Sequence, residues 1–140
     1  MKIKKILFAG IAGGLGNILI GSLLAYLTNW FLAKYFNVPE ANFGMSFPLV
    51  FLLPVTSFII ALIWVFVFAL LHNGIPGFKW IKGFIFGLLL WLVSSIPQNI
   101  LQYLASNDIS TIANIVSDLI QYPLVCLIFG IVYEVTDGNK

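Results

Sequence analysis

Four long stretches of uncharged, mostly apolar residues constrain this chain more than any other feature. They cover residues 6–33, 41–78, 83–107 and 109–133, where His72 is counted as neutral and only Asp118 interrupts the last stretch. A helix of about 20 apolar residues crosses a hydrocarbon core about 30 Å thick. The chain is therefore predicted to be an all-α integral membrane protein, a single membrane domain over 1–140 that forms an antiparallel bundle of four transmembrane helices. The predicted spans lie near 6–28, 48–71, 82–104 and 112–133.

Composition excludes several other classes of protein. The chain is 61% hydrophobic and 9% charged, whereas a soluble domain is about 45–50% apolar and about 25% charged. A net charge of +2 is too small to indicate a nucleic-acid partner. With one Cys and one His, an intrachain disulfide is excluded and a zinc site within the chain is not expected. We expect no metal and no cofactor, and the lipid bilayer as the main partner.

The glycines near the N-terminus admit a second interpretation. The apolar run KKILFAG leads into Gly10, Gly14 and Gly16, and this spacing resembles the glycine loop of the short-chain dehydrogenases, which implies a dinucleotide-binding Rossmann domain. The first helix of such a domain has a wet face, yet the 17 residues after Gly16 carry no charge. The nearest acidic residue, Glu40, lies 24 positions beyond Gly16, past the apolar run. A membrane helix is the better interpretation.

Small residues instead mark one face of the first span. They recur in steps of 4, 3, 4, 4 and 3, which places them on one side of a helix, and they are Gly10, Gly14, Asn17, Gly21, Ala25 and Thr28. Gly83 and Gly87 repeat the spacing in the third span. Helices in lipid associate by close packing, so small residues mark contact faces. The contact is either packing within the bundle or the seam of a homo-oligomer.

The lysines predict how the bundle is oriented. Lys34 lies on one side of the predicted membrane, and six lysines lie on the other, namely Lys2, Lys4, Lys5, Lys79, Lys82 and Lys140. The positive-inside rule then places both termini in the cytoplasm. In length and span number the chain resembles the many small four-span bacterial membrane proteins, which implies the plasma membrane of a bacterium.

A weak internal similarity suggests two helical-hairpin repeats. Lys5 and Gly10 align with Lys82 and Gly87 at an offset of 77, and Pro54 aligns with Pro123 at an offset of 69. Two such hairpins would be parallel repeats about an axis along the membrane normal. Any two apolar helices align to some degree, so chance similarity stays open as the alternative.

Polar side chains gather near prolines in the predicted spans. Pro54, Pro97 and Pro123 each remove a backbone donor and free the carbonyl four residues earlier. Most of the nearby polar residues fall in the outer half of the membrane, where four inward-facing polar faces would make a pocket open to the outside. The candidate ligand- or ion-binding residues are Asp118, Gln98, Asn99, Ser95, Gln121, Asn114 and Tyr122.

Asp118 is the central candidate. It lies about six residues inside the fourth span, or roughly 9 Å along the helix axis. No Lys or Arg lies inside any span, so Asp118 must be protonated, hydrated or bound to a cation. The sequence predicts that the chain binds or translocates a small solute, a cation or a proton around Asp118.

Two other functions stay open. If the polar residues only join helix to helix, the chain is a non-catalytic assembly or scaffold subunit that packs through its small-residue faces. A membrane enzyme acting on lipid or quinone would need a second catalytic group, and near Asp118 only Tyr122 and neutral amides are present. The sequence contains no recognisable catalytic constellation, and we do not expect an enzyme.

Overall fold

The computed structural model of the chain describes residues 3–37, 47–78 and 80–136, and these residues form helices and no strand. The helical elements are α1 (Ile3–Phe36), α2 (Phe47–Leu71), α3 (Trp80–Leu90), the π-helical turn η1 (Trp91–Ser95), α4 (Ile96–Ser106) and α5 (Ile109–Val135). The all-helical prediction is confirmed. The predicted connection between the first two spans includes residues 38–46, which lie outside the described part.

Four helical segments are long and apolar enough to cross a membrane, as the uncharged runs predict. They are Ile3–Phe36, Pro54–Leu71, Trp80–Ser106 and Ile109–Val135. Three of them extend beyond the predicted spans, because backbone hydrogen bonding continues a helix past the point at which polar residues reappear. α3, η1 and α4 together make the third segment.

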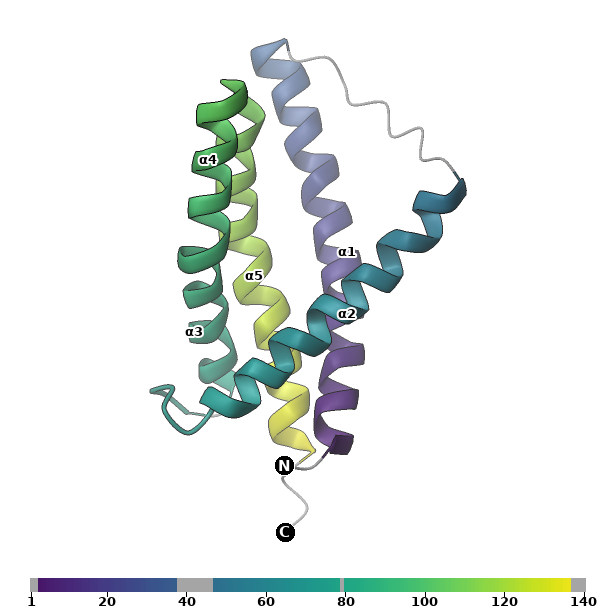
Figure 1. Ribbon diagram of the computed structural model, residues 1–140, viewed down its shortest axis with the longest axis vertical. Coiled ribbons are helices and arrows are strands. Elements are labelled where there is room, and N and C mark those ends of the chain that lie inside the picture. Colours follow the sequence, from purple (N-terminus) through teal and green to yellow (C-terminus); the bar gives the residue numbers. More distant parts are fainter. Residues whose placement is uncertain (1–2, 38–46, 79, 137–140) are drawn as a thin grey trace.

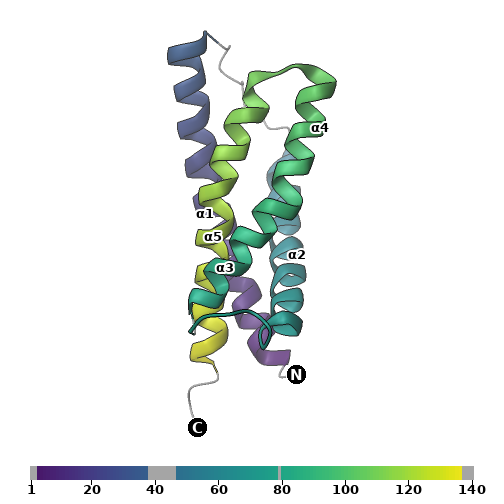
Figure 2. The same ribbon diagram turned by 90° about the vertical axis from the view of Figure 1, so that its left-hand side faces the viewer.

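Helix α5 is the centre of the arrangement. It packs along α1 on one side and along α3 and α4 on the other, while α2 packs chiefly against α1. Figures 1 and 2 show both termini and the 72–79 connection at one end of the molecule, with the turn between α4 and α5 at the other. α2 runs obliquely across the molecule in Figure 1, and the backbone of its described residues comes close to that of α3 or α4 at few points. Any binding site shared by α1, α4 and α5 is thus built without α2.

The aromatic core lies in the half of the molecule that holds the termini. Phe68 of α2 is fully buried, and its ring centroid lies 5.5 Å from that of Phe86, 5.4 Å from that of Phe129 and 5.5 Å from that of Tyr133. The mutual angles are edge-to-face, the arrangement that aromatic quadrupoles favour. The buried thiol of Cys126 belongs to the same core. This cluster holds together the ends of α2, α3 and α5.

Glycines set how closely α3 approaches α5. A Cβ atom added at Gly83 would lie 2.4 Å from the Cys126 carbonyl oxygen, and one added at Gly87 would lie 2.5 Å from the Cα of Pro123. Only a residue without a side chain allows backbones to approach this closely.

The glycine face of α1 is also covered within the chain. A Cβ added at Gly10 would meet Leu62 of α2, one at Gly14 would meet Phe58 of α2, and one at Gly21 would meet Gln121 of α5. α1 therefore contacts two neighbours through its small residues, α2 near the termini and α5 further along.

The π-helical turn lies just before Pro97. In this turn the Ile96 N–H donates to the carbonyl oxygen of Trp91, five residues earlier. Pro97 cannot donate, and a widened turn is one way in which a helix accommodates such an interruption. Ser95, the last residue of the turn, is almost fully buried, and Trp91 Nε1 donates to the Ile115 carbonyl of α5 over 2.9 Å. α2 and α5 continue as helices through Pro54 and Pro123.

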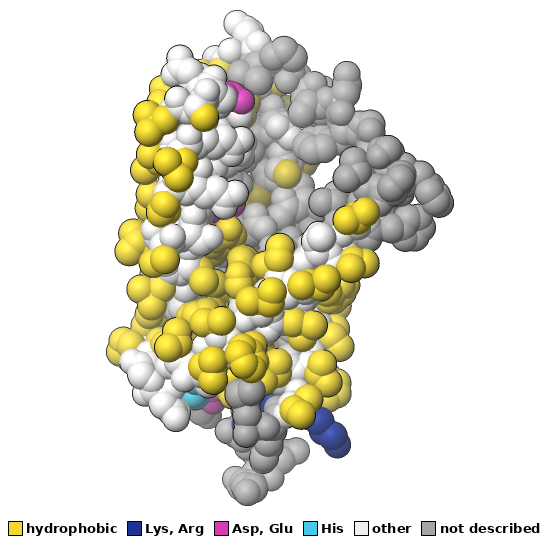
Figure 3. Space-filling view, in the orientation of Figure 1, with side chains coloured by type: hydrophobic (Ala, Val, Ile, Leu, Met, Phe, Trp, Pro, Cys, Tyr) yellow, Lys and Arg dark blue, Asp and Glu magenta, His cyan; other side chains and the backbone are white. Residues whose placement is uncertain are grey.

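The outer surface of the helices is apolar. Large hydrophobic side chains remain highly exposed, for example Leu19 at 70%, Val93 at 73% and Leu104 at 74%. Figure 3 shows hydrophobic side chains over much of one face, with most of the visible charged side chains near its two ends. A surface of this kind is unfavourable in water and favourable in hydrocarbon.

The start of α5 supplies a testable prediction at the beginning of the fourth apolar segment. Asp108 precedes the span, and its carboxylate accepts from Ser110 N over 2.9 Å and from Ser110 Oγ over 2.6 Å. These bonds lower the pKa of Asp108 below its ordinary value of 3.8. A lowered pKa means that the cap stabilises the folded state fully above 3.8 and is lost as the pH falls through the lowered value. Asp108→Ala should speed amide exchange in the first turn of α5 at neutral pH.

Ser106→Ala is the matched control, because the Ser106 hydroxyl donates only to the Gln102 carbonyl of α4. It should leave exchange in α5 unchanged. Exchange that is equally slow with alanine at position 108 would show that this carboxylate does not cap the helix.

Candidate functional site

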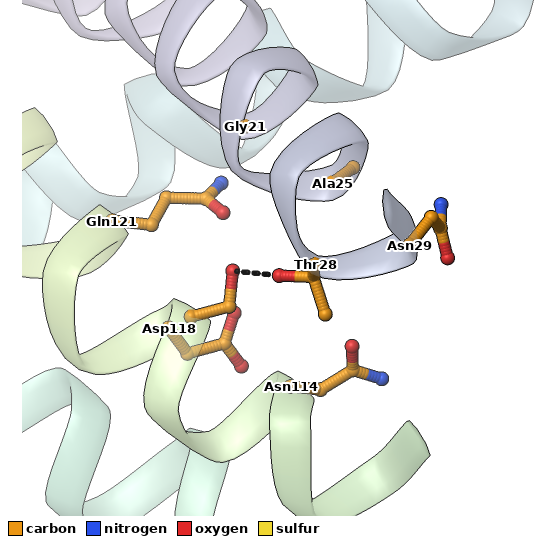
Figure 4. A pocket seen from close by; sticks show the side chains of 8 residues that line it. Gly21, Ala25, Thr28, Asn29, Asn114, Asp118 and Gln121 are labelled. Carbon is orange, nitrogen blue, oxygen red and sulfur yellow. Dashed lines mark hydrogen bonds between the residues drawn. The ribbon is translucent and has the colours of Figure 1, made fainter. Parts of the chain in front are cut away.

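A polar pocket of about 220 Å³ lies between α1 and α5, in the half of the molecule remote from the termini (Figure 4). Residues spaced by three or four along each helix line it, so each helix presents one face to the pocket. The lining residues of α1 are Gly21, Ala25, Thr28 and Asn29, and those of α5 are Asn114, Ser117, Asp118 and Gln121.

Small residues of α1 leave room for the pocket, and polar residues surround it. Gly21 and Ala25 carry little or no side chain, so α1 does not fill the gap that faces α5. Gln121 Nε2 donates to Asn17 Oδ1 over 2.8 Å and joins the two helices next to the pocket. Thr28 Oγ1 donates to Ser117 Oγ over 3.4 Å on another side (Figure 4). This bond is long for a contact between hydroxyls, which is usually about 2.7–2.8 Å.

The third helical segment contacts Asp118 through residues that do not line the pocket. Its Oδ2 accepts from Ser95 Oγ over 2.5 Å and from Asn99 Nδ2 over 3.4 Å. Asn99 also donates to the carbonyl oxygen of Ser95 over 2.9 Å. Ser95 and Asn99 are only 1% and 7% exposed, so these donors are fixed in place. Short O–H···O contacts of this kind are typical of an ionised acceptor.

The charge of Asp118 has no basic partner in the described part of the chain. The ion pair found there joins His72 to Glu134, at the opposite end of the molecule. Within the four long apolar segments an unpaired carboxylate is costly. A proton, water or a bound cation remains to compensate it.

The pocket offers mainly oxygen ligands. Hydroxyl, amide and carboxylate oxygens from both helices face a space that could hold several water molecules, since one water takes about 30 Å³. Oxygen ligands suit protons and hard cations such as Na⁺. Among the described residues no group of three or more His, Cys, Asp or Glu side chains could hold a metal ion. The site chemistry therefore centres on one carboxylate among neutral donors and acceptors.

The structure separates the candidate residues into three groups. Asp118, Asn114 and Gln121 line the pocket. Ser95 and Asn99 contact Asp118 but do not line it. The remaining two candidates do not line the pocket. Gln98 is exposed. The ring of Tyr122 packs against Trp64 of α2 with centroids 4.9 Å apart, while its hydroxyl group shares a hydrogen bond with Ser94 and lies near enough to Asp118 to interact with its charge.

The expected pocket of four converging helices is thus built differently. We expected Ser95 and Gln98 to share the inward face, but Ser95 and Asn99, four residues apart, turn toward α5 instead. Gln98 precedes Asn99 by one residue, or about 100° around the helix, and so points away. Among the described residues, those that line the pocket come from α1 and α5 and not from α2; Thr56 Oγ1 donates to the carbonyl of Leu52 in its own helix.

Three polar lining residues were not predicted as site residues: Thr28, Asn29 and Ser117. Thr28 was assigned to the packing face of the first span, together with Gly21 and Ala25. Small residues that allow close packing at one level of a helix leave a cavity at another, where the neighbouring helix diverges. The stripe itself was the available signal, since it ends at the hydroxyl group of Thr28 and the amide of Asn29 follows directly.

A second polar cluster joins four elements near the termini. His72 Nε2 lies 2.5 Å from Glu134 Oε1, and Lys82 Nζ donates to the His72 carbonyl over 2.9 Å. Lys5 Nζ lies 5.3 Å from the centre of the Tyr133 ring, a cation–π arrangement. His72 was expected to be a simple interfacial loop residue, and its contact with Glu134 could not be anticipated from residues 62 positions apart. These contacts fasten the helix ends together.

Comparison with protein-family models, with curated proteins and with solved structures gives no match for this chain. The pocket between α1 and α5 and the contacts of Asp118 are therefore the basis for a functional assignment.

Proposed function

We propose that this chain is a small multi-pass membrane protein that binds a small cation or a proton in the pocket between α1 and α5 and passes it across the membrane. Asp118 is the binding group. Asn114, Gln121 and the hydroxyl groups of Thr28 and Ser117 complete the polar lining. A proton-coupled neutral solute of small size would use the same groups.

The proposed setting is the plasma membrane of a bacterium, with the four apolar segments as an antiparallel bundle. Lys5 and Lys82 lie at the end that carries both termini, and Lys34 lies near the other end of α1. With the lysine-rich end in the cytoplasm, the pocket lies in the outer half of the membrane. A cation would enter it from the outer face.

One observation carries the proposal: the Asp118 carboxylate faces a polar cavity while fixed donors hold it from the opposite side. Ser95 and Asn99 orient one oxygen and leave the carboxyl group at the pocket wall. If Asp118 served only to join helices, direct bonds in a dry interface would be sufficient. A cavity of about 220 Å³ beside an uncompensated acid is what a cation site requires.

The assembly-subunit alternative has less support. It relied on glycine faces that remain free for a partner, but Gly10 and Gly14 lie against α2, and Gly83 and Gly87 lie against α5. A partner would have to use a different surface. The apolar exterior is accounted for by lipid contact.

The proposal is tested with the purified chain in lipid vesicles. Inward flux of H⁺ and Na⁺ is followed with a trapped pH-sensitive dye and with radioactive Na⁺, and methylammonium serves as a third probe. Asp118→Asn keeps the size and acceptor oxygen of the side chain and removes its charge. A charge-assisted contact is worth about 1.5–3 kcal/mol, so cation binding should weaken about 10- to 150-fold.

Asp108→Asn is the matched control, because Asp108 is an exposed carboxylate outside the spans. It should transport as the unaltered chain does. The proposal fails if the unaltered chain neither binds nor moves any of the three cations. It also fails if Asp118→Asn, folded and inserted, moves them at an unchanged rate.

A further inference from the structure

An apolar groove adjoins the polar pocket along the same pair of helices. It has a volume of about 420 Å³ and lies between α1 and α5. Its apolar walls include Leu24, Leu27 and Phe31 of α1, with Val116 and Ile120 of α5. Leu27, Phe31, Val116 and Ile120 are all well exposed on the surface of the bundle, so the groove opens toward lipid.

Two residues belong to both cavities. Thr28 and Ser117 line the polar pocket and also the apolar groove. Their hydroxyl groups form the 3.4 Å contact between the helices. A neutral bond of this length contributes little to stability, so parting these side chains costs little. The Thr28–Ser117 contact is therefore a weak boundary between a polar compartment that holds an acid and an apolar compartment open to lipid.

We infer that the site takes a cationic amphiphile, with its amine or ammonium head at Asp118 and its alkyl chain in the groove. This inference rests on the proposed function and names the class of ligand. The head enters from the lipid side between Thr28 and Ser117, and the chain remains against Leu24, Val116 and Ile120. Charge complementarity selects the head, because Asp118 is the ionisable group of the pocket and no lysine lines it.

An anionic lipid is the competing occupant, since Lys34 follows the groove residues on α1. Lys34 Nζ lies 4.8 Å from the centre of the Trp30 ring and 5.5 Å from that of the Tyr35 ring, so cation–π contacts already engage it. It does not line the groove. Thr28 and Ser117, which line both cavities, connect the groove to the pocket that holds Asp118. The geometry therefore favours a ligand with a cationic head.

Trp30 provides the measurement, because it lines the groove. The chain is placed in nanodiscs of neutral lipid, and tryptophan emission is quenched by dodecyl chains that carry bromine. The same chain is added with a trimethylammonium, a maltoside or a sulfate head at equal mole fraction in the membrane. We expect the ammonium compound to quench at least twofold more than the maltoside. Trp30→Phe should remove this excess, and Asp118→Asn should reduce it to the maltoside level.

Two further variants separate groove binding from general lipid contact. Ala113 lines the groove, whereas Ala105 is exposed on α4 and does not. Ala113→Phe should fill the groove and abolish the ammonium excess, and Ala105→Phe should leave it unchanged. Lys34→Gln should also leave it unchanged.

Equal quenching by the three heads would overturn the inference. So would an excess that follows the sulfate head and disappears with Lys34→Gln, which would identify an anionic lipid instead. If methylammonium still binds through Asp118 while the long-chain compound shows no excess, the amphiphile inference fails and the cation site stands. If Asp118→Asn alters neither readout, both fail.

Discussion

Gly87→Ala is expected to lower the free energy of unfolding by about 3 kcal/mol, the upper end of what overpacking usually costs. The added Cβ would lie 2.5 Å from the Cα of Pro123 and 2.6 Å from the carbonyl oxygen of Tyr122. Both are backbone atoms of α5, which cannot move without shifting the helix. Gly83→Ala should behave alike, since its Cβ would lie 2.4 Å from the carbonyl oxygen of Cys126. Alanine's better helix propensity, about 1 kcal/mol in water, offsets only part of this cost.

The unfolding is measured by titration with sodium dodecyl sulfate in mixed micelles, followed by helicity and tryptophan emission. Gly74→Ala is the control, because its nearest neighbour, the Leu71 carbonyl oxygen, would lie at an ordinary 3.5 Å. The loss of stability for Gly10→Ala should lie between those for Gly87→Ala and Gly74→Ala. The closest neighbour of the added Cβ at Gly10 is the end of the Leu62 side chain, which can change rotamer. A larger loss at Gly10 than at Gly87 would contradict the backbone contact between α3 and α5.

The helices were the part of this fold that local sequence could predict. The length of an apolar run can be counted directly along the sequence, so the uncharged runs indicated all four apolar segments. Their ends were less well predicted, because α1 continues through Lys34 to Phe36 and the third segment begins at Trp80. Charged or aromatic side chains are compatible with a continuing helix, so they did not mark where these helices end.

The packing of the helices was harder to predict. A uniformly apolar helix has no strong polar face to indicate its neighbours, and α2 illustrates this: nothing in its residues showed that it would lie against α1 and diverge from α4. The glycines gave more information, because small residues mark a close approach whichever helix is involved. They could not show that Gly10 and Gly21 would meet different helices.

The sequence predicted several of the residues at the site but not which helices would line it. Asp118, Asn114 and Gln121 follow from the polar face of a single helix, α5, which the sequence can locate. Ser95 and Asn99 depend on the π-helical turn before Pro97, because an added residue in a turn rotates everything that follows relative to what precedes it. Of the two neighbouring candidates in this segment, Asn99 contacts the acid and Gln98 is exposed.

Asp118→Asn is expected to raise the free energy of unfolding by about 1.5–2.5 kcal/mol while it weakens the binding of cations. A charged Asp at a helix centre costs about 2.5–3.5 kcal/mol on the insertion scale. The amide still accepts from Ser95 and Asn99, but a neutral hydrogen bond is weaker than a charge-assisted one by about 1 kcal/mol. The difference is a net gain in stability. A residue kept for binding is commonly a cost to the folded state, whereas a residue kept for helix packing is not.

Unfolding in mixed micelles with the Tris salt of dodecyl sulfate, which supplies no sodium, decides between these two roles. Ser95→Ala removes the donor that lies 2.5 Å from the Asp118 carboxylate, and it should cost about 1.5–3 kcal/mol when Asp118 is present. Its cost should be clearly smaller in the Asp118→Asn background, where the charge is gone, and the two changes should fail to add. If Asp118→Asn instead destabilises the chain, the carboxylate joins α5 to the third segment as a structural bond. The adjoining cavity would then need another explanation.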